Sequence, residues 1–121
     1  MDRYEEAAAL LAGEPDYRVL RRVQLADAQV FTANDAGEPC GRLAVIDTET
    51  TGLDVDAGER IIDLAVAVCE YGRHSGRLLR VVARYEGLED PGQPLPAEIT
   101  ALTGITDDML RGARFDEAAL A

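Results

Sequence analysis

The stretch from residue 43 to residue 53 constrains the fold of this 121-residue chain more than any other. Its four apolar residues, 43–46, form a short run of the kind found in strands that are buried on both faces. Asp47 and Glu49 follow. Because side chains alternate between the two faces of a strand, both carboxylates are expected on the same side. The sequence Thr50-Thr51-Gly52 then predicts a turn that ends the strand.

The paired carboxylates of Asp47 and Glu49 predict half of a metal site. Two like charges so close together are unfavourable unless a cation lies between them, and carboxylate oxygens suit hard ions such as Mg²⁺ and Mn²⁺. Taken alone, two acids at a strand end are explained more simply as residues that face solvent beside a turn. The surrounding sequence decides between these interpretations.

Residues 45–53 resemble the first motif of the DnaQ-like, or DEDD, 3′-to-5′ exonucleases. Residues 95–110 resemble the segment that follows the three-stranded meander in the same family. Two matches in the family's order are stronger evidence than either one alone. The resemblance covers about residues 42–121 and implies an α/β, ribonuclease-H-like exonuclease fold. This chain is expected to hold its N-terminal portion, truncated after the three-stranded antiparallel meander and the first helices.

The resemblance also implies roles for particular residues. Asp47 matches the acid that bridges two divalent ions, Mg²⁺ or Mn²⁺, and Glu49 matches the acid that binds the ion activating the attacking water. The implied reaction is two-metal hydrolysis that releases nucleotides from the 3′ end of DNA or RNA.

Four further positions match residues that hold the terminal nucleotide in this family. Thr50, Thr51 and Leu53 match the turn that contacts it through the backbone and an apolar wedge. Leu102, just before Thr103-Gly104, matches the residue that packs on the terminal base from the other side.

The family also requires two more aspartates and a histidine or tyrosine base, and no residue here matches them. We therefore expect an incomplete exonuclease domain that is inactive alone. One alternative is a non-catalytic remnant that acts as a binding or interaction module. The other is a haloacid-dehalogenase-like phosphatase, whose D-x-D-x-T motif is imitated by Asp47, Glu49 and Thr51.

Composition limits the partners. The net charge of −11 opposes broad electrostatic contact with a phosphate backbone, so a nucleic acid has to be held locally. No apolar run approaches the ~20 residues that span a membrane, and the two cysteines show no paired spacing, which predicts a cytoplasmic protein with reduced thiols. Uncovered apolar faces of a truncated sheet predict self-association.

The remaining sequence predicts a helical appendage at residues 1–41 and the exonuclease portion at 42–121. The appendage is expected to contain a helix at 4–12, a possible basic helix at 16–23 and a loop-like stretch at 24–40. Strands are expected at 61–71 and 77–85, joined by a hairpin turn that contains His74. A loop at 86–96 should lead to helices at 96–102, after Thr106 and from 115.

Overall fold

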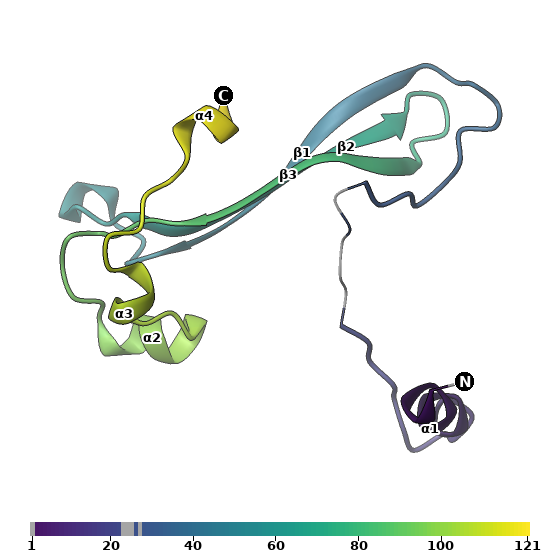
Figure 1. The fold of residues 1–121 in the computed structure, drawn as a ribbon, viewed down its shortest axis with the longest axis horizontal. Coiled ribbons are helices and arrows are strands. Elements are labelled where there is room, and N and C mark those ends of the chain that lie inside the picture. Colours follow the sequence, from purple (N-terminus) through teal and green to yellow (C-terminus); the bar gives the residue numbers. More distant parts are fainter. Residues whose placement is uncertain (1, 23–25, 27) are drawn as a thin grey trace.

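The computed structural model describes residues 2–22, 26 and 28–121, and its centre is one antiparallel sheet. Its strands are β1 (Cys40–Thr50), β2 (Ile61–Gly72) and β3 (Leu78–Leu88). They lie side by side in the order β1-β2-β3 and form a long, twisted ribbon (Figure 1). The predicted three-stranded meander with a central second strand is confirmed.

The strands are longer than the sequence predicted. β1 begins at Cys40, and β3 continues to Leu88 instead of ending at 85, so the loop that follows is shorter than expected. The reason is the long β2, whose residues 63–65 pair with residues 86–88 of β3 and satisfy their backbone groups. The hairpin turn between β2 and β3 contains His74, which is exposed as predicted.

β1 is not buried on both faces, contrary to the prediction from its apolar run. Leu43, Val45 and Ile46 are 36%, 56% and 62% exposed. β1 is an edge strand of the sheet and, among the described residues, pairs only with β2. An apolar run of this length indicates a strand but does not show what covers it.

Four short helical segments follow or interrupt the sheet. The 3₁₀ turn η1 (Val55–Ala57) lies between β1 and β2, while α2 (Ala97–Thr103), α3 (Asp107–Leu110) and α4 (Glu117–Leu120) follow β3. Gly104 ends α2 in the left-handed conformation with φ of 76°, and the Thr106 side chain caps α3 by accepting from the amide of Met109. Both boundaries were predicted from the sequence.

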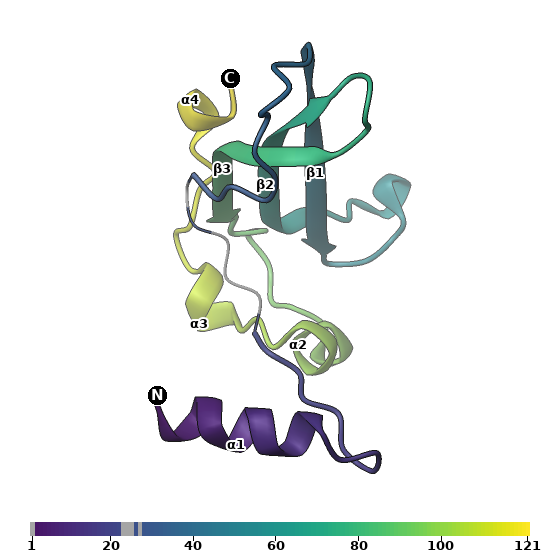
Figure 2. The same ribbon diagram turned by 90° about the vertical axis from the view of Figure 1, so that its right-hand side faces the viewer.

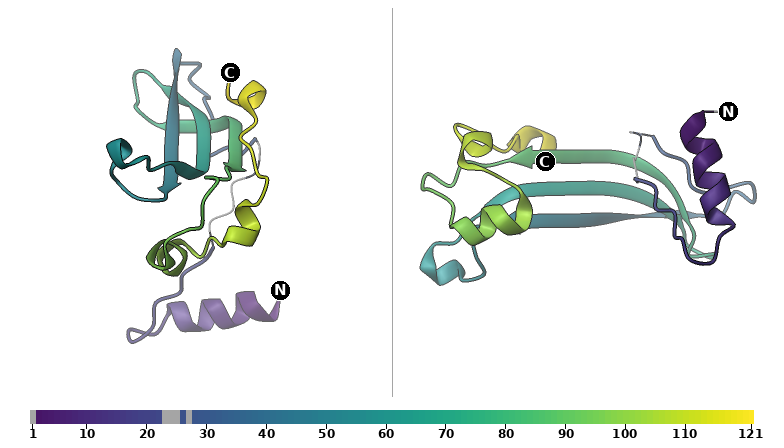
Figure 3. Two further views of the ribbon diagram at one scale, coloured as in Figure 1. Left: turned by 90° about the vertical axis from the view of Figure 1, so that its left-hand side faces the viewer. Right: turned by 90° about the horizontal axis from the view of Figure 1, so that it is seen from below.

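The main hydrophobic core joins the sheet to α2 and α3. Ile62 of β2, Ile105 and Leu110 are buried, with Leu88, Leu95 and Ile99 packed against them. Figures 2 and 3 show α2 and α3 together at the end of the sheet where β1 finishes. This core fixes those helices beside the carboxyl end of β1.

α4 packs on the sheet at another place. Its Ala119 and Leu120 line a small hollow with Val66, Val68 and Tyr85, and the amide of Asp116 donates to the Tyr85 hydroxyl at 2.9 Å. Figure 1 shows α4 on the opposite side of the sheet from α2 and α3. The two faces of the sheet therefore meet different helices.

The N-terminal region contributes to the sheet as well as forming a helix. α1 (Arg3–Ala12) confirms the predicted helix, but residues 16–22 are not helical, and Val23 lies outside the described residues. Gly13 caps the carboxyl end of α1, and its amide donates to the carbonyl of Leu11. Arg21, in the segment predicted to be a basic helix, forms an ion pair with Glu5 at 2.5 Å. The predicted division between residues 41 and 42 stays a prediction.

Residues 29–39 contact β3 and the hairpin. The amides of Phe31 and Thr32 donate to the carbonyl of Leu79, and the amide of Val81 donates to the carbonyl of Gln29. Glu38 accepts hydrogen bonds from the amides of His74 and Ser75 at 2.8 and 3.0 Å. Part of the loop-like stretch thus covers the outer edge of β3.

None of the helices in the described part of the chain is long and apolar enough to cross a membrane.

Ile62 and its neighbour Ile61 provide a test of this core. Ile62 is fully buried and Ile61 is 42% exposed. We expect Ile62→Ala to lower the free energy of unfolding by about 2–5 kcal/mol, because it removes buried methyl groups and leaves a cavity. Ile61→Ala, the matched control, should cost less than half as much. Chemical denaturation followed by circular dichroism measures both, and equal losses would contradict the placement of the core.

Candidate metal centre and nucleotide-binding turn

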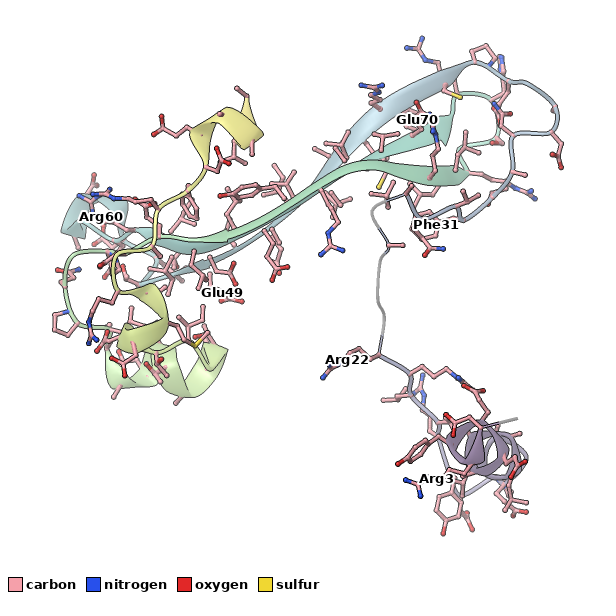
Figure 4. All side chains as sticks on the ribbon, in the orientation of Figure 1. Arg3, Arg22, Phe31, Glu49, Arg60 and Glu70 are labelled. Carbon is pink, nitrogen blue, oxygen red and sulfur yellow. The ribbon has the colours of Figure 1, made fainter. Side chains whose placement is uncertain are left out.

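Asp47 and Glu49 lie on one face of β1, close to its carboxyl end. Their cross-strand partners on β2 are Ala65 and Asp63, and residues directly opposite in an antiparallel pair share a face. Asp47 is exposed and Glu49 is half-buried. Figure 4 shows Glu49 on the side of the sheet where α2 and α3 lie. The structure therefore brings the two predicted carboxylates to one face, next to the helices.

Two more carboxylates share this face and were not selected from the sequence. Asp63 lies opposite Glu49, and Glu86 of β3 lies opposite Ala65, which in turn lies opposite Asp47. We call Asp47, Glu49, Asp63 and Glu86 the acidic face. The alternation of residues along β2 and β3 was visible in the sequence, but the register between strands was not, and the register is what places these acids together.

Asp63 is in the least favourable environment of the four. Its Oδ1 atom is buried and has no hydrogen-bond partner. Burial raises the pKa of the Asp63 carboxyl, and the negative charges of Glu86 and Asp47 raise it further. Asp63 therefore resists ionisation more than a fully solvated carboxyl group does.

The metal-binding capacity of this face is limited in the described residues. Among residues 2–22, 26 and 28–121, no group of three or more histidine, cysteine or acidic side chains is arranged to hold a metal ion. The donor chemistry of Asp47 and Glu49 fits Mg²⁺ or Mn²⁺, but two carboxylates leave most of an octahedral shell to water. The residues present fit part of a divalent metal site.

The hydroxyls of Thr50, the last residue of β1, and Thr51, in the turn that follows, both form hydrogen bonds within the protein. The Thr50 hydroxyl donates to the carbonyl of Gly52 at 2.7 Å. The Thr51 hydroxyl donates to the Glu59 carboxylate and accepts from the amide of Arg60. Thr51 is 3% exposed, so its side chain faces the protein interior. The hydroxyls of residues 50 and 51 therefore shape the turn.

Two leucines near the acidic face are unusually exposed. Leu53, in the turn, is 99% exposed, and Leu102, on α2, is 82% exposed. The hydrophobic effect opposes leaving such side chains in water, at about 1.5–3 kcal/mol for each one that could be buried. Both leucines belong to segments at the end of the sheet where β1 finishes (Figure 2). They offer exposed apolar contact surfaces at this end of the molecule.

The acidic face also borders a broad hollow of about 790 Å³. Asp47 and Glu86 line it together with Val45, Ala67 and Arg84. Arg84 lies 3.7 Å from Glu86 and reduces the negative charge on that side. Asp47 is therefore open to solvent at the edge of this hollow.

Comparison with known protein families identifies the class of this protein. The model of the exonuclease family RNase_T matches residues 44–121, which include the acidic face, the turn and the helices α2 to α4. The chain belongs to this family, the DnaQ-like 3′-to-5′ exonucleases, as the two motifs predicted.

Relatives of known name support this assignment. The chain is 43% identical over 88 residues to a PolC-type DNA polymerase III of Halalkalibacterium halodurans, an alignment that covers 71% of this chain and 6% of that protein. It is 40% identical over 70 residues to a DNA polymerase III subunit epsilon-like protein of Rhodobacter capsulatus, covering 57% and 9%. It is 35% identical over 77 residues to the 3′-5′ exonuclease DinG of Bacillus subtilis, covering 64% and 8%. The chain thus spans less than a tenth of the length of each of these relatives.

The family assignment excludes the alternative that the chain is a haloacid-dehalogenase-like phosphatase. Residues 47, 49 and 51 imitate a D-x-D-x-T motif only in spacing, and the Thr51 hydroxyl is occupied by Glu59 and Arg60. The sequence match extends far beyond these three positions, through residue 121.

The raised pKa of Asp63 predicts how stability depends on pH. Because its pKa is higher in the folded than in the unfolded chain, the ionised form opposes folding, and stability decreases as pH rises from the unfolded-state value through the folded-state value. Asp63→Asn removes this loss. We expect it to raise the melting temperature at pH 7 by a few degrees and to change it little at pH 3.

Thermal unfolding in the presence of a chelator measures this effect without metal ions. Asp56→Asn, at an exposed position of η1, is the matched control for the change of charge. A lower melting temperature of Asp63→Asn at pH 7 would show that the Asp63 carboxylate is stabilised in the fold.

Proposed function

We propose that this chain is the part of a 3′-to-5′ exonuclease domain that supplies two metal-binding carboxylates and the nucleotide-binding turn. The observation that carries the proposal is the position of Asp47 and Glu49 on one face of β1, directly before a turn that exposes Leu53. Membership of the exonuclease family supports the hydrolytic chemistry. A relative named as a 3′-5′ exonuclease supports the direction of digestion.

The electrostatics of the acidic face explain why the proposed reaction requires cations. Four carboxylates on one face repel the phosphodiester of a substrate, and the net charge of −11 adds to this repulsion. Mg²⁺ or Mn²⁺ held by Asp47 and Glu49 would offset this charge, polarise the phosphate and favour ionisation of the attacking water. Asp47 and Glu49 are therefore proposed as metal ligands and as catalytic residues.

The exposed leucines are proposed to position the substrate. Leu53 and Leu102 would contact the base of the terminal nucleotide, because bases stack on and pack against apolar surfaces in a sequence-tolerant way. The backbone of Thr50 and Thr51 would contact its sugar and phosphate, since both side-chain hydroxyls are already used within the protein. Such contacts select a chain end and not an internal sequence.

A second candidate function is binding without catalysis. It is favoured by the absence, within the described residues, of any three-residue group that could hold a metal ion. On this proposal the acidic face and the exposed leucines form a recognition surface for the 3′ end or for another protein. Cleavage assays separate the two functions.

Metal binding is the first test. We expect the chain to bind Mn²⁺ weakly in isothermal titration calorimetry, because water must supply most of the ligands. Asp47→Asn should weaken this binding by about tenfold or more, whereas Asp56→Asn, at an exposed position that is not part of the acidic face, should leave it unchanged. Tight binding that is insensitive to Asp47→Asn would show that the ion is held elsewhere.

Cleavage is measured on the same variants. A single-stranded oligonucleotide with a 3′ hydroxyl and Mn²⁺ should release negligible mononucleotide, because ions held by two carboxylates are poorly positioned, and an error of ~1 Å in position can cost about 10²-fold in rate. Asp47→Asn should remove any residual activity. Rapid digestion by the wild-type chain that is lost in Asp47→Asn would contradict an incomplete site and would indicate additional ligands from a second chain.

Self-association is a further proposal, based on the exposed strand β1. Ile46 is 62% exposed, and the outer edge of β1 is unpaired among the described residues. Exposed strand edges with apolar faces favour pairing between chains. We expect concentration-dependent dimers or larger species in sedimentation velocity, and a shift to monomer for Ile46→Lys.

Thr48→Lys is the matched control. Thr48 is exposed and lies on the same face as Ile46, so this variant adds the same charge without removing apolar surface. If the wild-type chain is a monomer across the micromolar range, the exposed face of β1 does not drive association.

A further inference from the structure

Hydrogen bonds join the turn that carries Leu53 to Glu59 and Arg60, eight and nine residues after Thr51. The buried Thr51 donates its hydroxyl hydrogen to the Glu59 carboxylate and accepts from the amide of Arg60 at 2.9 Å. The backbone amide of Thr51 also donates to the carbonyl of Arg60 at 2.9 Å. One buried side chain and one backbone group thus close the loop between β1 and β2.

The Glu59 carboxylate occupies the space beside Gly52. A Cβ atom at position 52 would lie 2.6 Å from the Glu59 carboxyl carbon, closer than real contacts allow. Glycine at 52 therefore permits Glu59 to reach Thr51. Glu59 is half-buried in this position.

Leu53 follows this anchored segment directly and has almost no contacts of its own. Its 99% exposure means that the conformation of residues 51 and 52, and not packing of its side chain, decides where it points. Residues whose side chains project freely lose orientation when the backbone beneath them becomes mobile, and ordering them on binding then costs conformational entropy.

From these contacts we infer that Glu59 is a positioning residue that, through Thr51, holds the turn in the conformation that presents Leu53 to the terminal nucleotide of the substrate. This inference rests on the proposed function of the turn. Glu59 itself contacts neither Asp47 nor Glu49 in any hydrogen bond or ion pair found among the described residues. Its effect on substrate is indirect.

The alternative is that Glu59 only stabilises the loop. A purely structural role predicts changes in stability without a specific change in oligonucleotide affinity. A positioning role predicts that the contribution of Leu53 to binding depends on Glu59. A double-mutant cycle between residues 53 and 59 separates the two.

The experiment measures fluorescence anisotropy of a 5′-labelled single-stranded oligodeoxynucleotide with a 3′ hydroxyl, with Ca²⁺ as the divalent ion. We expect Glu59→Ala and Thr51→Val each to weaken binding about tenfold, the loss expected for a hydrogen bond to a charged group. Glu59→Gln and Thr51→Ser retain an acceptor and a hydroxyl and should remain within about threefold of wild type. Leu53→Ala should weaken binding about tenfold in the wild-type chain and less than about twofold in Glu59→Ala.

Two controls make each outcome decisive. Mn²⁺ affinity by calorimetry should be the same in Glu59→Ala and wild type, because Glu59 is not a proposed ligand. Amide hydrogen exchange should be faster at residues 51–60 in Glu59→Ala than in wild type, and unchanged in β3. If Glu59→Ala does not fold, the double-mutant cycle is measured with Thr51→Val in its place.

Several results would overturn the inference. Affinity of Glu59→Ala or Thr51→Val equal to wild type, additive effects of residues 53 and 59, or Glu59→Gln as weak as Glu59→Ala would each exclude positioning through Thr51. Failure of the proposed function looks different, because the wild-type chain itself would then bind no oligonucleotide at any Ca²⁺ concentration.

Discussion

The register of the antiparallel ladder is the constraint on which the rest of this structure depends. Opposite Cα positions place Glu49 beside Asp63, and Asp47, Ala65 and Glu86 in one row across the sheet. A slip of one residue would send each of these acids to the other face. At this end of the sheet, Ile62 of β2 and Leu88 of β3 belong to one core with Ile105 and Leu110, and this packing holds the two strands together. The packing of the core and the gathering of charge therefore have a common origin.

The sequence predicted β1 and the family correctly because their signals are local. Asp47, Glu49 and the turn residues 50–53 lie within seven consecutive positions, and the capping residues Gly104 and Thr106 act over a single turn of helix. The same locality explains the correct prediction of the hairpin around His74. Such features depend on neighbouring residues in the sequence, so they can be predicted without knowing the tertiary structure.

Other features depend on distant partners and were missed for that reason. Strand pairing places the carboxylates of Asp63 and Glu86 on the acidic face. β3 extends to Leu88 because residues 63–65 of β2 pair with its last residues. Residues 29–32 looked like a loop, yet they pair with β3 through backbone groups that carry no sequence signature. The helix expected at 16–23 was inferred from an amphipathic pattern alone, and such a pattern does not by itself stabilise a helix of this length; residues 16–22 are not helical.

The turn between β2 and β3 also has a consequence for the order in which the chain folds. Tyr71 pairs with Leu78 across only six intervening residues, so this hairpin is closed by local contacts, which form on the microsecond timescale. The partners of Ile62 in the core, Ile105 and Leu110, are more than forty positions away and must wait for a larger loop to close. We expect the ribbon of β2 and β3 to form early and the helices that face the acidic face to dock late. The surface proposed to bind the substrate is then the last part of this molecule to acquire its native order.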